Sequence, residues 1–516
     1  MTSLTPAAAL LFALGIGTVA ATATQCTDRD LVSRPAGPSA APERPAQQDP
    51  GGGGERIRLL VSGAMLGRLE PCGCASGQLG GLPRRVQHIG EQRDYDLLIE
   101  GGDLVEGATE LDLLKGLTAL QVLSATHPYD AVGVGPNDLA LPPEQWAAFL
   151  TMVPAVASDL ECELPDWPAR PFVEKDVRGQ LVRIASLTVA LPAEPGEGNP
   201  AAELPFKIVP PLTAWQRAMA DVADSTLRVL LYHGGDMPAR DLVPQLEPKP
   251  DLVVCFDESH SEPPAQPETV AGVPLVFPGI RGRVMLELTL QRTATGPSLG
   301  YSPVPLPASK TLPGGGGDPD TKAMLLQHRQ DVAADHVLEK LAEQHPTSNG
   351  ARYVGSQTCA GCHPSASQVW QQTRHAHAWQ TLVDAEQDPK RYGWPVTQYP
   401  DCVSCHVVGY GDVSGFVNPK KTPQLTDVGC ERCHGAGSDH IGNPAANPLG
   451  IRGGTAPSML CVQCHDFEQS PDFLYGDKWK LIEHGLEPHM VQARKARGIE
   501  PKNGDAKNGD PNDGKK

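Results

Sequence analysis

Four short stretches in the last third of the chain decide its fold: Cys359-Ala-Gly-Cys-His363, Cys402-Val-Ser-Cys-His406, Cys430-Glu-Arg-Cys-His434 and Cys461-Val-Gln-Cys-His465. In this C-x-x-C-H spacing, two thiols can bond to the vinyl groups of one haem while the adjacent histidine ligates its iron. Zinc binding by C-x-x-C pairs is the alternative, but zinc does not require a histidine directly after every pair. The motifs therefore predict four covalently attached c-type haems.

The motifs assign roles residue by residue. The predicted haem-attachment residues are Cys359, Cys362, Cys402, Cys405, Cys430, Cys433, Cys461 and Cys464, and the predicted proximal iron ligands are His363, His406, His434 and His465. Each iron also needs a second axial ligand or an open position, and other histidines of the region are candidates. Four macrocycles would also supply large apolar core elements to residues 350–490, where periodicity is poor and an aliphatic core is not expected.

Five histidines outside the motifs are candidate sixth ligands. His375 and His377 lie in a segment, 365–384, that reads as a helix, where they would point about 200° apart. At most one of them should therefore face a given haem. His440, His484 and His489 follow the third and fourth motifs. A solvent-exposed role is the alternative for each, and it is favoured for His377 and His489.

Composition limits the class of protein. The chain has 516 residues, enough for two or three domains, and its 51 prolines and 54 glycines indicate long irregular segments and linkers. The formal net charge of −18 comes from 43 basic and 61 acidic residues. An acidic surface repels phosphate backbones, so no nucleic-acid partner is expected.

The N-terminus predicts export. An apolar run from Ala7 to Ala23 ends in Ala-Thr-Ala, which is typical of a cleaved signal peptide covering residues 1–23. No lysine or arginine precedes the run, so an uncleaved membrane anchor is an alternative, as is lipid attachment at Cys26. We expect a periplasmic protein, or one anchored in the membrane and facing the periplasm or cell surface.

Composition shifts divide the rest of the chain. Strand-like runs at 57–61, 97–99, 181–187, 227–232 and 252–255 alternate with helical segments, which predicts an α/β domain. A helix is expected at 321–345 from its apolar spacing. The predicted domains are a flexible linker at 24–55, the α/β domain at 56–308, a linker and helix at 309–348, the haem domain at 349–490 and a disordered tail at 491–516.

Residues 353–490 resemble the tetrahaem cytochromes c that carry electrons away from hydroxylamine oxidation. The resemblance rests on the four motifs together with Trp370, Thr373, His375-Ala376, Gly409-Tyr410-Gly411 and Ser470-Pro471. It implies a mainly helical, loop-rich fold with closely packed haems. It also implies three haems with two histidine ligands, the distal ones being His375, His440 and His484, and one haem without a protein sixth ligand, at the second motif.

Residues 57–292 resemble the calcineurin-like sandwich of 5′-nucleotidases. Asp103 and His233 stand where that family has metal ligands, so they would form a vestigial metal site. The family's first Asp-x-His is replaced by Ala64-Met65-Leu66, its Asn-His pair by Pro136-Asn137, and its late Gly-His-x-His loop by residues 255–260. Most metal ligands are therefore gone, and two-metal phosphoesterase activity is not expected.

A cysteine loop follows the first strand. Glu70-Pro71-Cys72-Gly73-Cys74 resembles a diverged nucleotidase branch with a reactive cysteine or selenocysteine in this loop. Cys255, in the degenerate late loop, is expected to face the same cleft. A redox-active or metal-binding group of Cys72, Cys74 and Cys255 is one hypothesis. A structural disulfide or inert thiols are the alternative.

Together these patterns predict an exported tetrahaem cytochrome that transfers electrons between redox proteins, or from a quinol-linked donor. The N-terminal domain would then be a docking or thiol-redox module, with membrane anchoring at the N-terminus left open. The alternative is a multihaem oxidoreductase acting on a small substrate at an open haem or at the Cys72/Cys74 loop. The number of iron ligands separates the two, because a haem with an open position permits catalysis.

Overall fold

The computed structural model describes residues 55–72, 77–92, 94–190, 204–310, 315–388, 392–450, 457–466, 469–489 and 491–492. Residues 52–516 form one compact unit. The predicted signal peptide, Cys26, Cys74, nearly all of the first linker and nearly all of the tail lie outside the described residues. Among the helices that are described, none has the length and apolar character needed to cross a bilayer.

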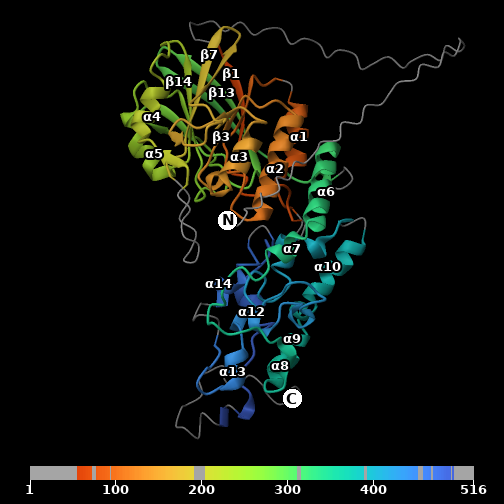
Figure 1. Ribbon diagram of the computed structural model, residues 1–516. Coiled ribbons are helices and arrows are strands. Elements are labelled where there is room, and N and C mark those ends of the chain that lie inside the picture. Colours follow the sequence, from red (N-terminus) through yellow and green to blue (C-terminus); the bar gives the residue numbers. More distant parts are fainter. Residues whose placement is uncertain are drawn as a thin grey trace, which may run out of the picture. The chain divides into compact units, whose positions relative to one another are not determined.

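Two six-stranded sheets form the N-terminal domain (Figure 1). The first contains, in spatial order, β14 (Gly296–Pro305), β13 (Val284–Thr293), β1 (Ile57–Ser62), β2 (Leu97–Glu100), β3 (Ala131–Gly133) and β4 (Ala155–Val156). The second contains β11 (Glu268–Val270), β12 (Val273–Val276), β10 (Leu252–Cys255), β9 (Leu227–Tyr232), β7 (Gln180–Leu187) and β6 (Val173–Val177). A separate pair joins β5 (Leu160–Cys162) to β8 (Phe206–Ile208). All five predicted strands are present, and the α/β prediction is confirmed.

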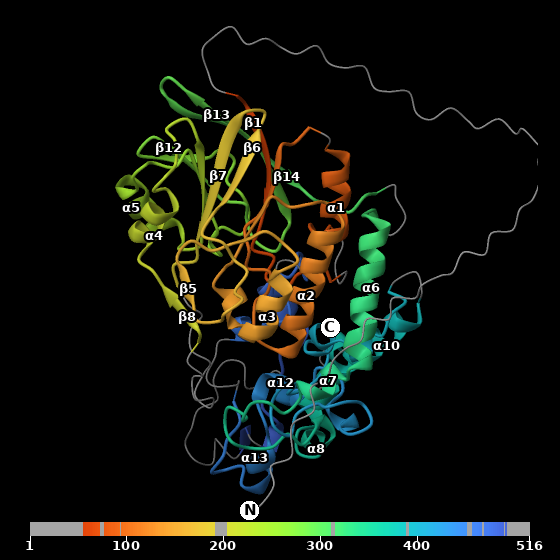
Figure 2. The same ribbon diagram turned by 45° about the horizontal axis from the view of Figure 1, so that its top comes forward.

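The sheets pack face to face because apolar residues alternate along their strands. Ile57, Leu59 and Val61 of β1 share a buried cluster with Ile184 and Val229 of the second sheet. The outer faces are covered by helices (Figure 2). They are α1 (Leu82–Glu91), α2 (Glu110–Ala125), η1 (Asn137–Ala140) and α3 (Pro143–Leu150) on the first sheet, and α4 (Pro211–Ala218), α5 (Asp236–Leu242) and η2 (Val243–Gln245) on the second. The result is a four-layer sandwich.

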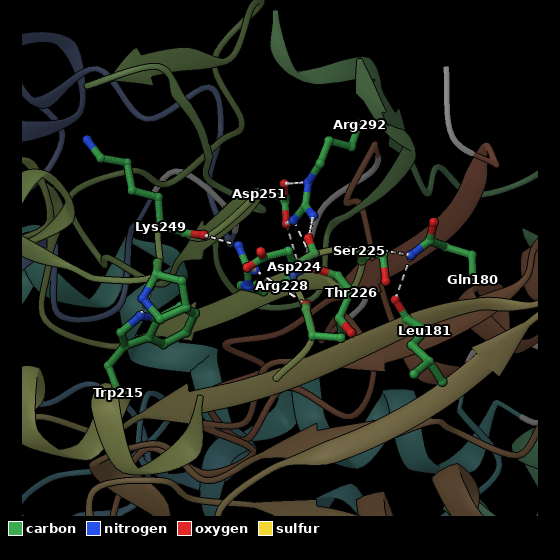
Figure 3. A network of polar contacts seen from close by, with 12 residues as sticks. Gln180, Leu181, Trp215, Asp224, Ser225, Thr226, Arg228, Lys249, Asp251 and Arg292 are labelled. Atoms are coloured by element: carbon green, nitrogen blue, oxygen red, sulfur yellow. Dashed lines mark hydrogen bonds and ion pairs between the residues drawn. The ribbon is translucent and has the colours of Figure 1, made fainter. Parts of the chain in front are cut away.

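An ion pair between a half-buried arginine and a buried carboxylate ties the two sheets together at one end (Figure 3). Arg292 of β13 donates from Nε to Asp251, which precedes β10, at 2.8 Å, and from Nη2 to the Thr226 carbonyl at 2.9 Å. The other oxygen of Asp251 accepts the backbone N–H of Arg228 at 2.8 Å. Since a buried carboxylate is stable only when it is paired and hydrogen-bonded, this network fixes one sheet against the other.

The segment that leaves the sandwich differs from the single helix predicted at 321–345. It forms α6 (Pro319–Ala334) and the short α7 (Val337–Lys340), separated at His336. His336 has φ = 54°, a left-handed conformation that ends a right-handed helix. Apolar spacing continues across the break, so the pattern of the sequence does not reveal it.

The C-terminal region is mainly helical and rich in loops, as predicted. Its elements are α8 (Ser356–Ala360), α9 (Pro364–Gln371), η4 (Arg374–His377), α10 (Ala378–Gln387), η5 (Val396–Gln398), α11 (Pro400–Val403), η6 (Pro423–Leu425), α12 (Cys430–His434), α13 (Ser438–Gly442), α14 (Pro457–Cys461) and α15 (Tyr475–Trp479). The predicted continuous helix at 365–384 is wrong. Thr373 is extended, with φ = −94° and ψ = 161°, so α9 ends before η4 begins.

An apolar core does exist in this region, contrary to the expectation from periodicity. Val396, Val403, Val407, Phe416 and Leu425 are all fully buried in one cluster. Most of these side chains come from loops and single turns rather than from periodic elements. Patterns of period 3.6 or 2 therefore could not identify them. The haems would add to this core rather than replace it.

Candidate functional site

Each C-x-x-C-H motif folds as a short helical turn. The turns are α8, α11, α12 and α14, or the residues that directly follow them. In the first and fourth motifs the histidine N–H donates to the carbonyl of the first cysteine, from His363 to Cys359 at 2.9 Å and from His465 to Cys461 at 2.8 Å. A single turn therefore presents two thiols and one imidazole together, as covalent haem attachment requires.

Three motif histidines face histidines from outside the motifs. The ring centroids are 6.1 Å apart for His363 and His440, 6.1 Å for His465 and His375, and 5.9 Å for His434 and His484. A metal–imidazole bond is about 2 Å long, and the ring adds roughly 1 Å on each side. Two imidazoles on opposite sides of one ion thus have centroids about 6 Å apart, so each pair fits a single iron.

The fourth motif histidine is different. His406, in the second motif, makes no ring pair with another histidine among the described residues. Its Nδ1 donates to the carbonyl of Ala378 at 2.6 Å. His377 and His489 likewise form no such pair in the described parts of the chain. Each of the three histidines that the resemblance implies as distal ligands thus faces a motif histidine, and these ligand assignments stay predictions.

Hydrogen bonds orient several of these rings. Nδ1 of His434 donates to the Gly450 carbonyl at 2.9 Å, and Nδ1 of His440 donates to the Asn447 carbonyl at 2.8 Å. Nδ1 of His465 is hydrogen-bonded to Ser470 Oγ at 2.9 Å. A bond at one ring nitrogen fixes the tautomer and the ring orientation, and leaves Nε2 for a metal.

Burial favours the neutral, metal-ligating form of two of these histidines, His375 and His434. Burial lowers the pKa of His375, with a smaller contribution from nearby His465. Burial also lowers the pKa of His434, more than the bond to Gly450 raises it. Because only neutral imidazole has a lone pair for iron, this environment suits ligation.

The attachment cysteines of different motifs meet. Cys359 of the first motif contacts Cys430 of the third, and Cys405 of the second contacts Cys464 of the fourth. Arg432 of the third motif donates from Nη2 to Cys464 Sγ at 3.6 Å. The motifs therefore follow one another in space in the order first, third, fourth, second.

The two residues predicted to form a vestigial metal site contact each other. Asp103 Oδ2 and His233 Nδ1 are 3.1 Å apart, and His233 Nε2 donates to the Gly101 carbonyl at 3.0 Å. Burial disfavours a charged His233, but the hydrogen bond and charge of Asp103 outweigh it and raise the pKa of His233. Phe256 stacks on His233 with centroids 4.8 Å apart. Both potential ligands are thus engaged within the protein.

Sequence reasoning missed Asp138, the acidic neighbour of this pair. It is 1% exposed and accepts the backbone N–H groups of Asp103, Leu104 and Gly135 at 2.7–3.0 Å. Burial, together with the charge of Asp103, raises the pKa of Asp138. The sequence offered one signal for Asp138. It directly follows Asn137, in the motif where this chain departs from the family's Asn-His pair.

Of the three cysteines predicted to act together, the structure describes Cys72 and Cys255, and these two do not lie together. Cys72 Sγ accepts a hydrogen bond from Gln78 Nε2 at 3.1 Å, whereas Cys74 lies outside the described residues. Cys255, expected to face the cleft, is fully buried between β10 and the helices on the outer face. Strand alternation explains this, since Val254 points into the sandwich and Cys255 points away. Burial raises the pKa of the Cys255 thiol, which disfavours its reactive form.

One compact group of three potential metal ligands is found among the described residues: Asp236, Asp257 and His260. Each of its members already has a protein partner. Asp236 pairs with Arg240 at 3.2 Å and with His260 at 3.5 Å, and Asp257 accepts the backbone N–H of Asp236 at 2.7 Å. These bonds account for the cluster without an ion.

Comparison with known proteins supports a c-type haem region. Residues 358–435 match the family described as "Cytochrome c554 and c-prime". Cytochrome c-554 of Nitrosomonas europaea is 37% identical over 102 residues, which are 18% of this chain and 42% of that protein. The match thus spans less than half of this relative. The family implies covalently bound c-type haem.

Two solved structures give partial likenesses. A 5′-nucleotidase precursor from Thermus thermophilus has 19% identity and a TM-score of 0.44, over 54% of this chain and 59% of that one. Reduced cytochrome c554 from Nitrosomonas europaea has 23% identity and a TM-score of 0.22, over 29% and 98%. The C-terminal part of the chain is therefore similar in sequence to the cytochrome c554 and c-prime family, and it follows an N-terminal α/β sandwich.

Proposed function

We propose that this protein is an exported tetrahaem c-type cytochrome that transfers electrons between redox partners outside the cytoplasm. The observation that carries the proposal is the set of three histidine pairs, each with centroids 5.9–6.1 Å apart and each containing one motif histidine. Three independent pairs at the separation expected for imidazoles on one iron are hard to explain otherwise. When bound, the haems would supply one-electron transfer.

The chain itself would hold the four haems in a row. The contacts between Cys359 and Cys430, Arg432 and Cys464, and Cys464 and Cys405 support the order first, third, fourth, second motif. Adjacent attachment cysteines bring neighbouring groups close together, which suits a carrier that accepts electrons at one end and donates them at the other.

The N-terminal domain would act at the second-motif end of this row. Lys115 of α2 pairs with Asp401, the residue before Cys402, at 2.7 Å. Tyr392 Oη donates to the Cys72 carbonyl at 2.8 Å, which holds the cysteine loop against the haem region. These contacts support a docking or thiol-redox role for the domain, with redox proteins or a quinol-linked donor as partners.

Redox-titrated absorption and electron paramagnetic resonance spectra of the holoprotein test the proposal. We expect three low-spin haems with two histidine ligands, at potentials below those of a His/Met cytochrome, because methionine ligation raises the potential. Replacing His375, His440 or His484 singly with Met should raise the potential of one haem each. His377→Met is the matched control and should change no potential. A potential that moves with His377→Met and not with His375→Met would overturn the ligand assignment.

A second candidate is an oxidoreductase that acts at the second motif. The observation in its favour is that no described histidine ring faces His406. We expect one high-spin haem that binds carbon monoxide when reduced. The signal of this haem should be lost selectively in His406→Ala. If all four haems are low-spin and bind no carbon monoxide, this second candidate is excluded and a pure carrier remains.

A further inference from the structure

A buried carboxylate is fixed beside the first motif. Glu487 is 2% exposed and lies three residues after His484, one of the predicted distal ligands. Its Oε1 accepts the backbone N–H groups of Ser365 at 2.9 Å and Ala366 at 3.1 Å. Its Oε2 accepts the Ser365 hydroxyl at 2.8 Å. Three hydrogen bonds thus hold this side chain in one position.

These bonds cap the helix that follows the first motif. The two N–H groups belong to the first turn of α9, and the N-cap residue of α9 is His363, the predicted proximal ligand. The first N–H groups of a helix have no partner within it, and His363 makes no side-chain capping bond. Glu487 supplies the acceptor from a distant part of the chain, and its negative charge suits the positive end of the helix. Glu487 therefore fixes the backbone next to His363.

The same side chain connects two of the three histidine pairs. His484, three residues before Glu487, faces His434 of the third motif. His363, two residues before the bound Ser365, belongs to the pair with His440. A change at Glu487 therefore acts on the first site through the start of α9, and on the third site through the segment that carries His484.

The charge of Glu487 acts on His363. Burial lowers the pKa of His363, and the negative charge of Glu487 opposes this effect because it favours a positive ring. Burial alone would raise the pKa of Glu487, but the bonds from Ser365 and Ala366 bring it below its ordinary value. Glu487 is therefore a carboxylate at neutral pH. Ferric iron carries one more positive charge than ferrous iron, so a fixed negative charge nearby favours the ferric state.

We propose that Glu487 is a positioning residue of the first-motif site that lowers the reduction potential of the haem bound there. This inference rests on the proposed electron-transfer function and names a residue that regulates it. Glu487 holds the backbone beside His363 and places a negative charge near the iron that His363 would ligate. The first motif lies at one end of the row of motifs. A lower potential at that end favours electron transfer onward to the third motif.

Redox titration of the full-length holoprotein, followed by absorption and electron paramagnetic resonance, tests this role. The first-motif haem is identified as the one whose potential rises in His440→Met. Glu487→Gln removes the charge but can keep all three bonds, because an amide oxygen accepts two N–H groups and the amide nitrogen donates to the Ser365 hydroxyl. We expect this variant to raise the potential of the same haem and to leave its low-spin signal unchanged.

The size of the shift follows from the lost charge. A unit charge roughly 10 Å from an iron, at an effective dielectric constant of about 20, changes the ferric-to-ferrous ratio at a fixed potential roughly tenfold. A tenfold change corresponds to about 59 mV for one electron. A purely structural role would leave every potential unchanged in Glu487→Gln, because the bonds are kept.

Glu386→Gln is the matched control. Glu386 Oε2 also accepts a backbone N–H and a hydroxyl, both of Thr397, at 3.0 and 2.6 Å, but Thr397 lies near the second motif. This variant should leave the first-motif haem unchanged. The proposal is overturned if Glu487→Gln shifts no potential, if it shifts the potential of another haem instead, or if Glu386→Gln shifts the first-motif haem equally. If His440→Met shifts no potential while Glu487→Gln raises one, the ligand assignment behind the proposed function fails and the effect of the charge stands.

Discussion

A buried histidine between the two regions predicts acid sensitivity. His328 of α6 is 5% exposed. Its Nδ1 lies 3.0 Å from Thr118 Oγ1, and its Nε2 lies 3.0 Å from Tyr399 Oη. The Thr118 hydroxyl donates its proton to the Leu114 carbonyl at 2.9 Å. His328 must therefore donate from Nδ1. In the neutral ring, Nε2 accepts the Tyr399 hydroxyl.

Burial, with Lys115 and Arg329 nearby, lowers the pKa of His328 to about 4 from its ordinary 6.5. Between these values the unfolded chain binds more protons than the folded protein, so stability falls as the pH falls. The contribution of His328 is fully present above pH 6.5 and is lost as the pH drops to about 4. The difference of about 2.5 between the pKa values of the folded and unfolded states corresponds to about 3 kcal/mol in the free energy of unfolding.

Urea denaturation followed by circular dichroism, at pH values from 7 to 4, measures this effect. His328→Gln keeps a polar side chain that cannot be protonated. We expect the wild-type protein to be the more stable of the two at pH 7, with the difference in unfolding free energy shrinking by about 3 kcal/mol towards pH 4. Leu326→Ala, on the exposed face of the same helix, is the control, and it should show a constant difference because neither side chain titrates. A wild-type to His328→Gln difference that does not change with pH would refute the reasoning.

Three further predictions concern packing and the vestigial metal site. Phe256→Ala should lower the free energy of unfolding by about 3–5 kcal/mol in chemical denaturation, because Phe256 is 5% exposed and fills the space beside Gly63 and Gly101. Glu431→Gln should lower it by about 1–3 kcal/mol in the same assay, because the buried carboxylate accepts three backbone N–H groups. Added divalent metals should give no nucleotide hydrolysis near 1 s⁻¹, and metal-dependent turnover that Asp103→Asn abolishes would contradict the loss of this site.

The strands were predictable because each is a compact apolar run bounded by turns, and those runs were found where the sequence indicated. The breaks at His336 and Thr373 were not, because each depends on one backbone conformation that apolar spacing does not encode. Core residues that lie in loops, such as Phe416, were not predicted for a related reason, since they belong to no periodic element.

The candidate site also has parts that the sequence could predict and parts that it could not. C-x-x-C-H carries its chemistry in five consecutive residues, so the attachment positions could be read locally. The partners of those histidines are distant in sequence. The sequence favoured His440 and His484 over His489 as ligands, but it did not say which motif histidine each of them faces.

The mass of the denatured holoprotein tests the central claim most directly. Thioether bonds survive denaturation, so the account predicts a mass increase equal to four haems, and Cys405→Ala should weaken or abolish attachment at the second motif alone. A denatured protein that carries no covalent haem would contradict the account.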